Sequence, residues 1–240
     1  MVFALCECVD MSALGELTKC IVNFFLNHGQ LMRLLEGTIK YEIHRTLEIG
    51  TLFRSNSVAA KVLGHFIRLS GRRYLLELLG PLLKELALED KDVEIDSFRC
   101  ELAEDVVQQH VVELSAICTK FLQRIDSMVD QCPLQFRIIC NLLHTETKRK
   151  FPDLEWPIAT GGFFFLRYIC PAIVAPETIM PEFATLAKGP NVRRTLVLLT
   201  KTMQNLANGT RFFKEPFMMS MVPWIDEHLP QCKDMFLDLS

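Results

Sequence analysis

The stretch from Glu104 to Val129, "EDVVQQHVVELSAICTKFLQRIDSMV", decides the fold class. Its apolar side chains recur at steps of three and four, which is the period of one face of an α-helix. The members of this stripe are Val107, His110, Val111, Leu114, Ile117, Cys118, Phe121, Leu122, Ile125 and Met128. A long helix with one wide apolar stripe must bury that stripe against other elements, so the sequence predicts a helical core.

The rest of the chain repeats this helical pattern, and the alternation typical of β-strands is nearly absent. Further helices are predicted at about residues 12–27, 30–47, 57–70, 72–88, 133–150, 158–169, 191–208 and 216–228. No solenoid repeat is visible. The sequence therefore predicts a single, elongated all-α domain over residues 1–240.

Three local signals refine this prediction. Gly80-Pro81 should kink or split the helix over 72–88, because proline lacks a backbone donor. Asn191 is expected to cap the helix that ends at Gly209. The acidic segment from Leu88 to Asp105 is expected to be an exposed connection between two halves of the domain.

The composition excludes several classes of protein. Half of the 240 residues are hydrophobic, which predicts a sizeable core, yet no run of 18–20 apolar residues predicts a membrane span. The net charge is −3 and the basic residues are spread along the chain, unlike those of a nucleic-acid binder. The basic run Lys148 to Lys150 is interpreted as a solvated helix terminus.

The cysteines and histidines show no metal-site spacing. There are nine cysteines, an odd number without a Cys-x-x-Cys pair, and several of them, including Cys118 and Cys140, fall on apolar helix faces. We expect reduced, buried thiols in a cytosolic protein, without a disulfide framework or a structural zinc ion.

Arg54 stands in the short interruption "TLFRSNS", from Thr51 to Ser57. The residues after it are good helix N-caps, so the next helix is expected to begin there. Leu52 and Phe53 can become buried on the upstream side. Arg54 is therefore expected to project from a loop fixed at both ends, although a solvated surface arginine is the simpler alternative.

Arg167 lies in "GGFFFLRYICPAIVAP", from Gly161 to Pro176. A helix that is apolar on all sides is buried, and a buried guanidinium requires hydrogen-bond acceptors. Arg167 is therefore expected to bind backbone carbonyls or a carboxylate and to hold another segment in place, the alternative being an internal salt bridge without functional consequence. Pro171 is expected to end or bend this helix.

A third candidate surface lies in "TLVLLTKTMQNLANGTRFFKEPF", from Thr195 to Phe217. One face of its helix carries Leu196, Leu199, Met203, Leu206 and Ala207, and the opposite face carries Lys201, Gln204, Asn205 and Asn208. One lysine with three amides suits a polar partner, although an ordinary solvated face is the alternative. Lys201 could also form an ion pair with Glu215.

Together these three stretches resemble the Ras GTPase-activating protein domain over about residues 30 to 220. "TLFRSNS" resembles the arginine-finger loop of that family, in wording similar to the neurofibromin and synaptic subgroups. "GFFFLRYICPAIVAP" is similar to its most characteristic motif, and "KTMQNLAN" with "FKEPF" to a third block. Three blocks in this order and spacing make a chance match very improbable.

The resemblance implies a role for each residue. Arg54 is the finger that enters the nucleotide site of a bound small GTPase, and its backbone carbonyl holds the catalytic glutamine of that GTPase. Arg167 stabilises the finger loop. The positions that line or support the GTPase-binding groove are Phe53, Leu166, Lys201, Gln204, Asn208, Lys214 and Glu215.

The resemblance also implies partners and cofactors. The partner is a Ras-family small GTPase in its GTP-bound state, and the GTP and magnesium belong to that partner, since this chain has no Walker-type phosphate loop. We expect a cytoplasmic monomer that is recruited to the inner face of the plasma membrane through its partner or flanking modules. We also expect it to be an activator and not an enzyme in isolation. The alternatives are a GTPase-binding scaffold of the same fold without stimulating activity, and an unrelated helical scaffold with a peptide groove.

Overall fold

The computed structural model describes residues 6, 8–52, 57–100, 102–211 and 213–240, and this part of the chain is helical without any strand. The α-helices are α2 (Met11–Asn27), α3 (Leu31–Arg45), α4 (Val58–Ser70), α5 (Arg72–Glu89), α6 (Ser97–Cys100), α7 (Glu104–Ser127), α8 (Leu134–Lys150), α9 (Ile158–Gly161), α10 (Cys170–Val174), α11 (Phe183–Leu186), α12 (Val192–Ala207) and α13 (Val222–Asp238). The 3₁₀ turns are η1 (Ile49–Thr51), η2 (Val129–Gln131), η4 (Pro176–Thr178) and η5 (Pro216–Met221), and η3 (Gly162–Ile169) is a π-helix. The prediction of an all-α fold is confirmed.

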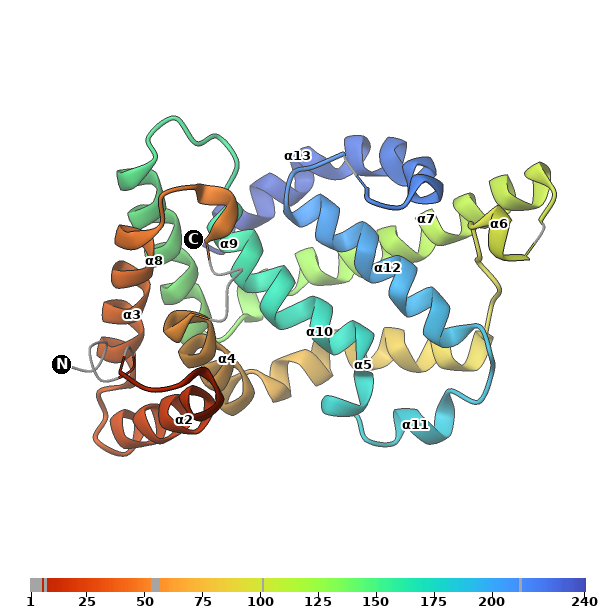
Figure 1. Cartoon of the computed structure of the whole chain (residues 1–240). Helices are drawn as coiled ribbons and strands as arrows, with labels where there is room; N and C mark the ends of the chain where they lie inside the picture. Colours follow the sequence, from red (N-terminus) through yellow and green to blue (C-terminus); the bar gives the residue numbers. More distant parts are fainter. Residues whose placement is uncertain (1–5, 7, 53–56, 101, 212) are drawn as a thin grey trace.

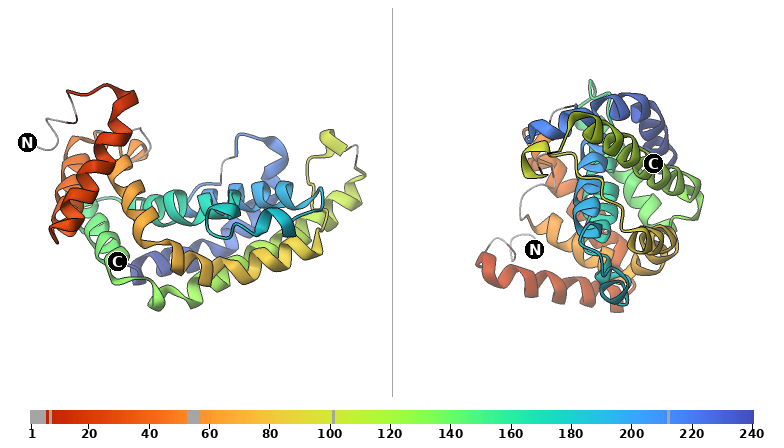
Figure 2. Two further views of the ribbon diagram at one scale, coloured as in Figure 1. Left: turned by 90° about the horizontal axis from the view of Figure 1, so that it is seen from below. Right: turned by 90° about the vertical axis from the view of Figure 1, so that its right-hand side faces the viewer.

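The molecule is elongated and curved, as Figure 1 and the left panel of Figure 2 show. The helices α2, α3, α4 and α8 pack against one another at one end. The helix α12 crosses the middle in contact with η3, α7, α10 and α13. The helices α5 and α7 run toward the opposite end, where α6 lies (Figure 1). No described helix is both long and apolar enough to cross a lipid bilayer.

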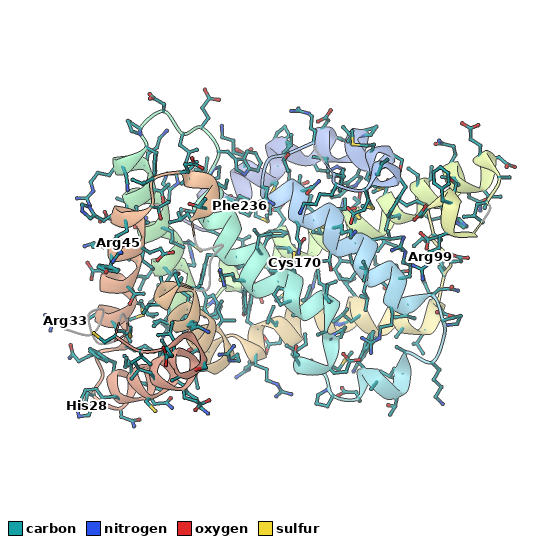
Figure 3. The ribbon with its side chains drawn as sticks, in the orientation of Figure 1. His28, Arg33, Arg45, Arg99, Cys170 and Phe236 are labelled. Atoms are coloured by element: carbon teal, nitrogen blue, oxygen red, sulfur yellow. The ribbon has the colours of Figure 1, made fainter. Side chains whose placement is uncertain are left out.

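The apolar faces predicted from the sequence form the core. On α7 the buried residues include Leu114, Cys118 and Ile125, and on α12 the whole predicted apolar face is buried. Cys118 and Cys140 are buried as free thiols, as is Cys170 in the middle of the molecule (Figure 3). Burial raises the pKa of all three thiols, so they remain protonated and act as small apolar side chains.

Pro81 does not split its helix, contrary to one of the expected outcomes. The helix α5 continues through Pro81 as one element, and the proline ring lies on the exposed side. A proline leaves the carbonyl four residues earlier without its helical donor. Arg124 of α7 supplies that donor, since its guanidinium binds the carbonyl oxygen of Glu77 at 3.1 Å. A tertiary contact therefore replaces the missing helical hydrogen bond.

Pro171 does not end its helix either. The π-helix η3 passes directly into α10, so the helical segment that begins at Ile158 extends to Val174. A wider π-helical turn before Pro171 accommodates the missing donor at the proline. The helix predicted over 216–228 also differs from the structure. The 3₁₀ turn η5 occupies its first six residues and leads into α13, which continues to Asp238 with exposed Pro230 inside it.

The acidic segment before α7 is only partly exposed, which corrects the prediction of an exposed connection. Val93, Glu94 and Ile95 are buried, with 1%, 4% and 2% of their surface accessible. Asp90 accepts hydrogen bonds from the backbone N–H groups of Asn191 (3.0 Å) and Val192 (3.1 Å). The cap of α12 is therefore the carboxylate of Asp90, and the side chain of Asn191 makes no capping hydrogen bond.

Candidate functional site

A hollow of about 340 Å³ brings together four of the residues predicted from the sequence. Leu166 and Arg167 come from η3, Gln204 comes from the last turn of α12, and Asn208 directly follows that helix. The remaining lining residues are Ile49, Leu52, Ile158 and Gly162. The described lining contains one guanidinium and two amides, which can form hydrogen bonds with a polar partner.

Arg54 and Phe53 lie outside the described residues, in the gap 53–56. The two described ends of this gap are held in place, as the sequence predicted. Leu52 is buried, with 8% of its surface exposed, and it lines the hollow. Ser57 caps α4, because its hydroxyl oxygen accepts a hydrogen bond from the backbone N–H of Ala60 at 3.2 Å.

Arg167 is half-buried at the junction of two hollows. The second hollow, of about 480 Å³, extends toward α2 and α4 and is lined by Lys61, His65 and Arg68 as well as by Leu166 and Arg167. Burial lowers the pKa of the Arg167 guanidinium, and the negative charge of Glu42 opposes this shift. Within the described ranges the guanidinium has no hydrogen-bond acceptor, so its predicted role as a support for the loop stays a prediction.

The packing around η3 fixes Leu166 and Arg167 in the wall of the hollow. The neighbouring side chains Phe163, Phe164, Phe165 and Tyr168 are buried, and the hydroxyl of Tyr168 donates to the carbonyl oxygen of Gly71 at 2.7 Å. Phe165 also packs edge-on against Phe236 of α13, which is labelled in Figure 3, at 5.5 Å between ring centroids. Five of the residues of η3 are buried, which leaves Leu166 and Arg167 as its two half-exposed side chains.

Two glycines allow the segment before η3 and the C-terminal end of α12 to approach each other closely. A Cβ on Gly161 would lie 2.6 Å from the carbonyl oxygen of Ala207, the last residue of α12. Gly209 has a φ of +63° and ends α12, as predicted, with the indole of Trp156 packed against it. The indole N–H of Trp156 donates to the carbonyl oxygen of Ala207 at 2.9 Å. These contacts hold Gln204 and Asn208 opposite Arg167.

Lys201 and Glu215 form the predicted ion pair, one turn along α12 from Gln204. Their side chains are 30% and 40% exposed, and a hydrogen bond from Lys201 lowers the pKa of the Glu215 carboxyl. The ammonium group also lies 6.0 Å from the ring centroid of Phe217. Lys214 is exposed beside this pair. None of these three residues lines the hollow.

The basic run at the end of α8 is not a simple solvated terminus, which corrects the sequence interpretation. The ammonium group of Lys150 donates to the carbonyl oxygens of Ile43 (2.8 Å), His44 (2.6 Å) and Thr46. Lys148 donates to the carbonyl oxygens of Pro152 (2.9 Å) and Leu154 (2.6 Å). Lys150 thus binds the C-terminal end of α3, directly before the segment that leads to Arg54.

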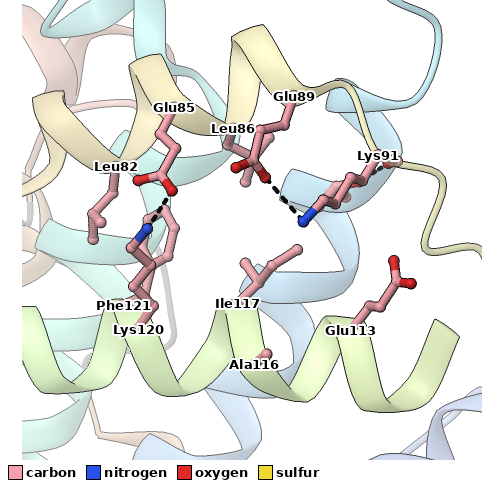
Figure 4. A pocket seen from close by; sticks show the side chains of 11 residues that line it. Leu82, Glu85, Leu86, Glu89, Lys91, Glu113, Ala116, Ile117, Lys120 and Phe121 are labelled. Carbon is pink, nitrogen blue, oxygen red and sulfur yellow. Dashed lines mark hydrogen bonds and ion pairs between the residues drawn. The ribbon is translucent and has the colours of Figure 1, made fainter. Parts of the chain in front are cut away.

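A separate hollow of about 200 Å³ lies between α5 and α7 (Figure 4). Two ion pairs are among its lining residues, Glu85 with Lys120 and Glu89 with Lys91 (3.3 Å). None of the residues predicted for the site lines it, so it is distinct from the candidate site.

Comparisons with known proteins identify the family and relatives that match most of the chain. Residues 34–104 and 97–208 match the family described as "GTPase-activator protein for Ras-like GTPase". The chain is 31% identical over 243 residues to "Probable Ras GTPase-activating-like protein ngap" of Dictyostelium discoideum, covering 96% of this chain and 27% of that protein. It is 30% identical over 244 residues to "Ras GTPase-activating protein 4" of Mus musculus (93% of this chain, 30% of that protein). It is 31% identical over 236 residues to "Neurofibromin-A" of Dictyostelium discoideum (90% of this chain, 26% of that protein).

The chain thus spans less than a third of the length of these relatives. The family match covers both walls of the hollow, η3 and α12, as well as the segment that contains Arg54. On these grounds the chain belongs to the family of GTPase-activator proteins for Ras-like GTPases.

Proposed function

We propose that this chain stimulates GTP hydrolysis by a GTP-bound small GTPase of the Ras family, and that Arg54 enters the nucleotide site of the partner. The observation that carries the proposal is the hollow in which Arg167, Leu166, Gln204 and Asn208 meet next to Leu52, the last described residue before the gap that contains Arg54. Polar groups converge there with an apolar wall, which is typical of a binding surface for another protein.

The chemistry requires a positive charge that is already in place when the partner binds. As the γ-phosphoryl group leaves, negative charge spreads over the phosphate oxygens, and a preorganised guanidinium stabilises it without further reorganisation. Arginine fingers of this kind accelerate hydrolysis by roughly 10³–10⁵-fold in small GTPases generally. That acceleration corresponds to about 4–7 kcal/mol of activation free energy.

The division of roles follows from the residues in the hollow. We assign GTP and magnesium to the partner, and to this chain one catalytic side chain in trans, so it acts as an activator and not as an enzyme in isolation. Arg167 is proposed to support the segment around Arg54, while Phe53, Leu166, Gln204 and Asn208 contact the partner. Lys201 of α12 extends that contact together with Lys214 and Glu215, which lie directly before η5.

The test is single-turnover GTP hydrolysis by Ras-type and Rap-type GTPases, with the wild-type chain and with Arg54→Ala. Wild type should accelerate hydrolysis, and Arg54→Ala should abolish the acceleration while its affinity for the GTP-loaded partner stays within about tenfold. Binding without acceleration by wild type would favour the alternative, a GTPase-binding scaffold. Equal acceleration by both chains would refute the assignment of Arg54.

A further inference from the structure

Two side-chain anchors lie on either side of the segment that carries Arg54. The first is Lys150, which donates to three backbone carbonyls at the end of α3. The last carbonyls of a helix have no helical donor, and a cation is favoured there by the helix dipole. Lys150 therefore fixes the position at which the chain leaves α3, at Thr46.

The second anchor is Glu42, in the last turn of α3. Its carboxylate accepts a hydrogen bond from the hydroxyl of Ser57 at 2.9 Å, across fifteen positions of the chain. The same hydroxyl oxygen accepts from the N–H of Ala60, so Ser57 is simultaneously the cap of α4. Glu42 thus fixes the position at which the chain enters α4.

The two anchors act on one end of one helix. Thr46 and Ser57, the two ends of the connection, are both held against the last turn of α3, which packs against α4 and α8. Tying the ends of a loop together reduces the number of conformations open to it. Part of the entropy cost of placing a side chain between them is then met during folding, before any partner binds.

Glu42 has a further property that Lys150 lacks. Its negative charge opposes the lowering of the Arg167 pKa that burial causes. Hydrogen bonds to an ionised carboxylate are about twice as strong as those between neutral groups, which suits an anchor.

We propose that Glu42 is a positioning residue: by holding Ser57 on the last turn of α3, it fixes where the chain enters α4 directly after the segment that carries Arg54. The proposal rests on the proposed function of Arg54, since it concerns the placement of that guanidinium. Lys150 is the matching anchor at the other end of the connection.

The first test uses the free protein and needs no GTPase. Amide hydrogen exchange over residues 47–60 is measured by mass spectrometry in wild type, Glu42→Ala and Glu42→Gln. Glu42→Ala should accelerate exchange in this segment roughly tenfold, the effect of losing one charged hydrogen bond. Glu42→Gln keeps an acceptor for Ser57 and should stay near wild type.

Glu36→Ala is the matched control. Glu36 is an exposed glutamate on the same helix, and its carboxylate pairs with Lys40 and not with the connection. It should leave exchange over residues 47–60 unchanged.

The second test is the single-turnover rate at saturating activator, measured together with the Kd for the GTP-loaded partner. Glu42→Ala should lower the maximal rate roughly 10–100-fold, as displacement of a catalytic group does, with the Kd within about threefold of wild type. Glu42→Gln should recover most of the rate. A purely structural role would instead move the Kd and the melting temperature, and the Gln variant would give no recovery.

The outcomes separate the two proposals. Unchanged exchange in Glu42→Ala, or a loss confined to the Kd, would overturn the role of Glu42 even if Arg54→Ala abolishes stimulation. Full stimulation by Arg54→Ala would overturn the assignment of Arg54 and, with it, the catalytic consequence assigned to Glu42.

Discussion

The guanidinium of Arg167 lies among apolar side chains that hold its backbone rigidly, while its own surface faces two hollows. Burial lowers the pKa of this group, so water solvates it incompletely and it should bind any acceptor that the partner or the loop offers. Its planar fork of donors distinguishes it from a lysine, which carries the same charge as a compact point.

For this reason we expect Arg167→Ala and Arg167→Lys to lower the stimulated rate by at least about tenfold, because neither side chain can make paired hydrogen bonds. Under the proposed support of the Arg54 segment by Arg167, the alanine variant should also melt at a lower temperature, since it would leave the acceptors of that segment unpaired at a cost of about 1–3 kcal/mol. Stimulation assays and thermal melts of both variants measure these effects. Wild-type rates in the lysine variant would show that only the charge matters.

Lys201 illustrates a charge whose place is fixed by a neighbour. Its ion pair with Glu215 holds the ammonium group near Phe217 on the surface of α12. Exposed pairs add little to stability, and we propose that this placement serves recognition of the partner.

Lys201→Ala should therefore raise the Kd for the GTP-loaded partner roughly tenfold at low salt, and the difference should shrink at high salt, where exposed charges are screened. The maximal rate should not change. Lys188→Ala, at an exposed position outside both hollows, serves as the control. Equal affinities at every salt concentration would limit Lys201 to its pairing with Glu215.

At the scale of elements, the connection between α5 and α7 is fastened to α12 by charges. Asp90 caps α12, and Glu94, only 4% exposed, accepts two hydrogen bonds of 2.8 Å from the guanidinium of Arg194. Burial by itself would raise the pKa of the Glu94 carboxyl. The hydrogen bonds from Arg194 and from the N–H of Asp96, with the charges of Arg194 and Arg99, outweigh that effect and lower the pKa.

This shift has a definite sign in its effect on stability. Because the folded pKa lies below the ordinary value of 4.5, the Glu94 contribution is complete above about pH 4.5 and is lost as the pH falls through the folded pKa. Glu94→Gln should lower the free energy of unfolding at pH 7 and flatten its decrease on acidification. Denaturant unfolding at pH 7 and below pH 4.5 measures both effects.

Glu89→Gln is the control for that experiment, since Glu89 is exposed and pairs with Lys91 at 3.3 Å. It should retain the pH dependence of wild type. An unchanged pH profile in Glu94→Gln would mean that the pair with Arg194 is balanced by the cost of its burial.

The helices were predictable from sequence because each carries an apolar stripe that spacing alone reveals, as on α7. The exceptions are positions where a distant group changes the local rule. Pro81 stays within α5 because Arg124, from another helix, replaces the lost hydrogen bond, and Glu94 is buried because Arg194 pairs with it. Neither partner is visible in a local window of sequence.

The same distinction applies to the site. Leu166, Arg167, Gln204 and Asn208 were identified because their segments have distinctive motifs, and the structure places them together. Glu42 and Lys150 were missed, since one binds a serine fifteen positions away and the other binds backbone carbonyls, which any residue carries.

At the scale of the whole molecule, one apolar core extends from Val22 to Leu239. The two tryptophans report on different parts of it. The indole N–H of Trp156 binds the carbonyl oxygen of Ala207 beside the candidate site, whereas that of Trp224 binds the hydroxyl of Thr119 on α7 at 2.8 Å. The prediction that residues 1–240 form one domain can therefore be tested with two internal probes.

Trp156→Phe and Trp224→Phe each leave a single tryptophan. For each variant we expect the unfolding midpoint measured by fluorescence to coincide with the midpoint measured by far-UV circular dichroism, because a domain with one core unfolds cooperatively. Two separate midpoints within one variant would show that the chain consists of independently unfolding units.

The central claim is that this chain contributes a guanidinium to the transition state formed in another protein. Its most direct test compares two affinities for a Ras-family GTPase. The first is measured with the GTPase loaded with GDP and aluminium fluoride, which mimics the transferring phosphoryl group. The second is measured with the same GTPase loaded with a non-hydrolysable GTP analogue. Arg54→Ala should weaken binding of the transition-state mimic by at least about 100-fold and binding of the GTP analogue by less than about tenfold. Equal affinity of wild type and Arg54→Ala for the transition-state mimic would contradict the account.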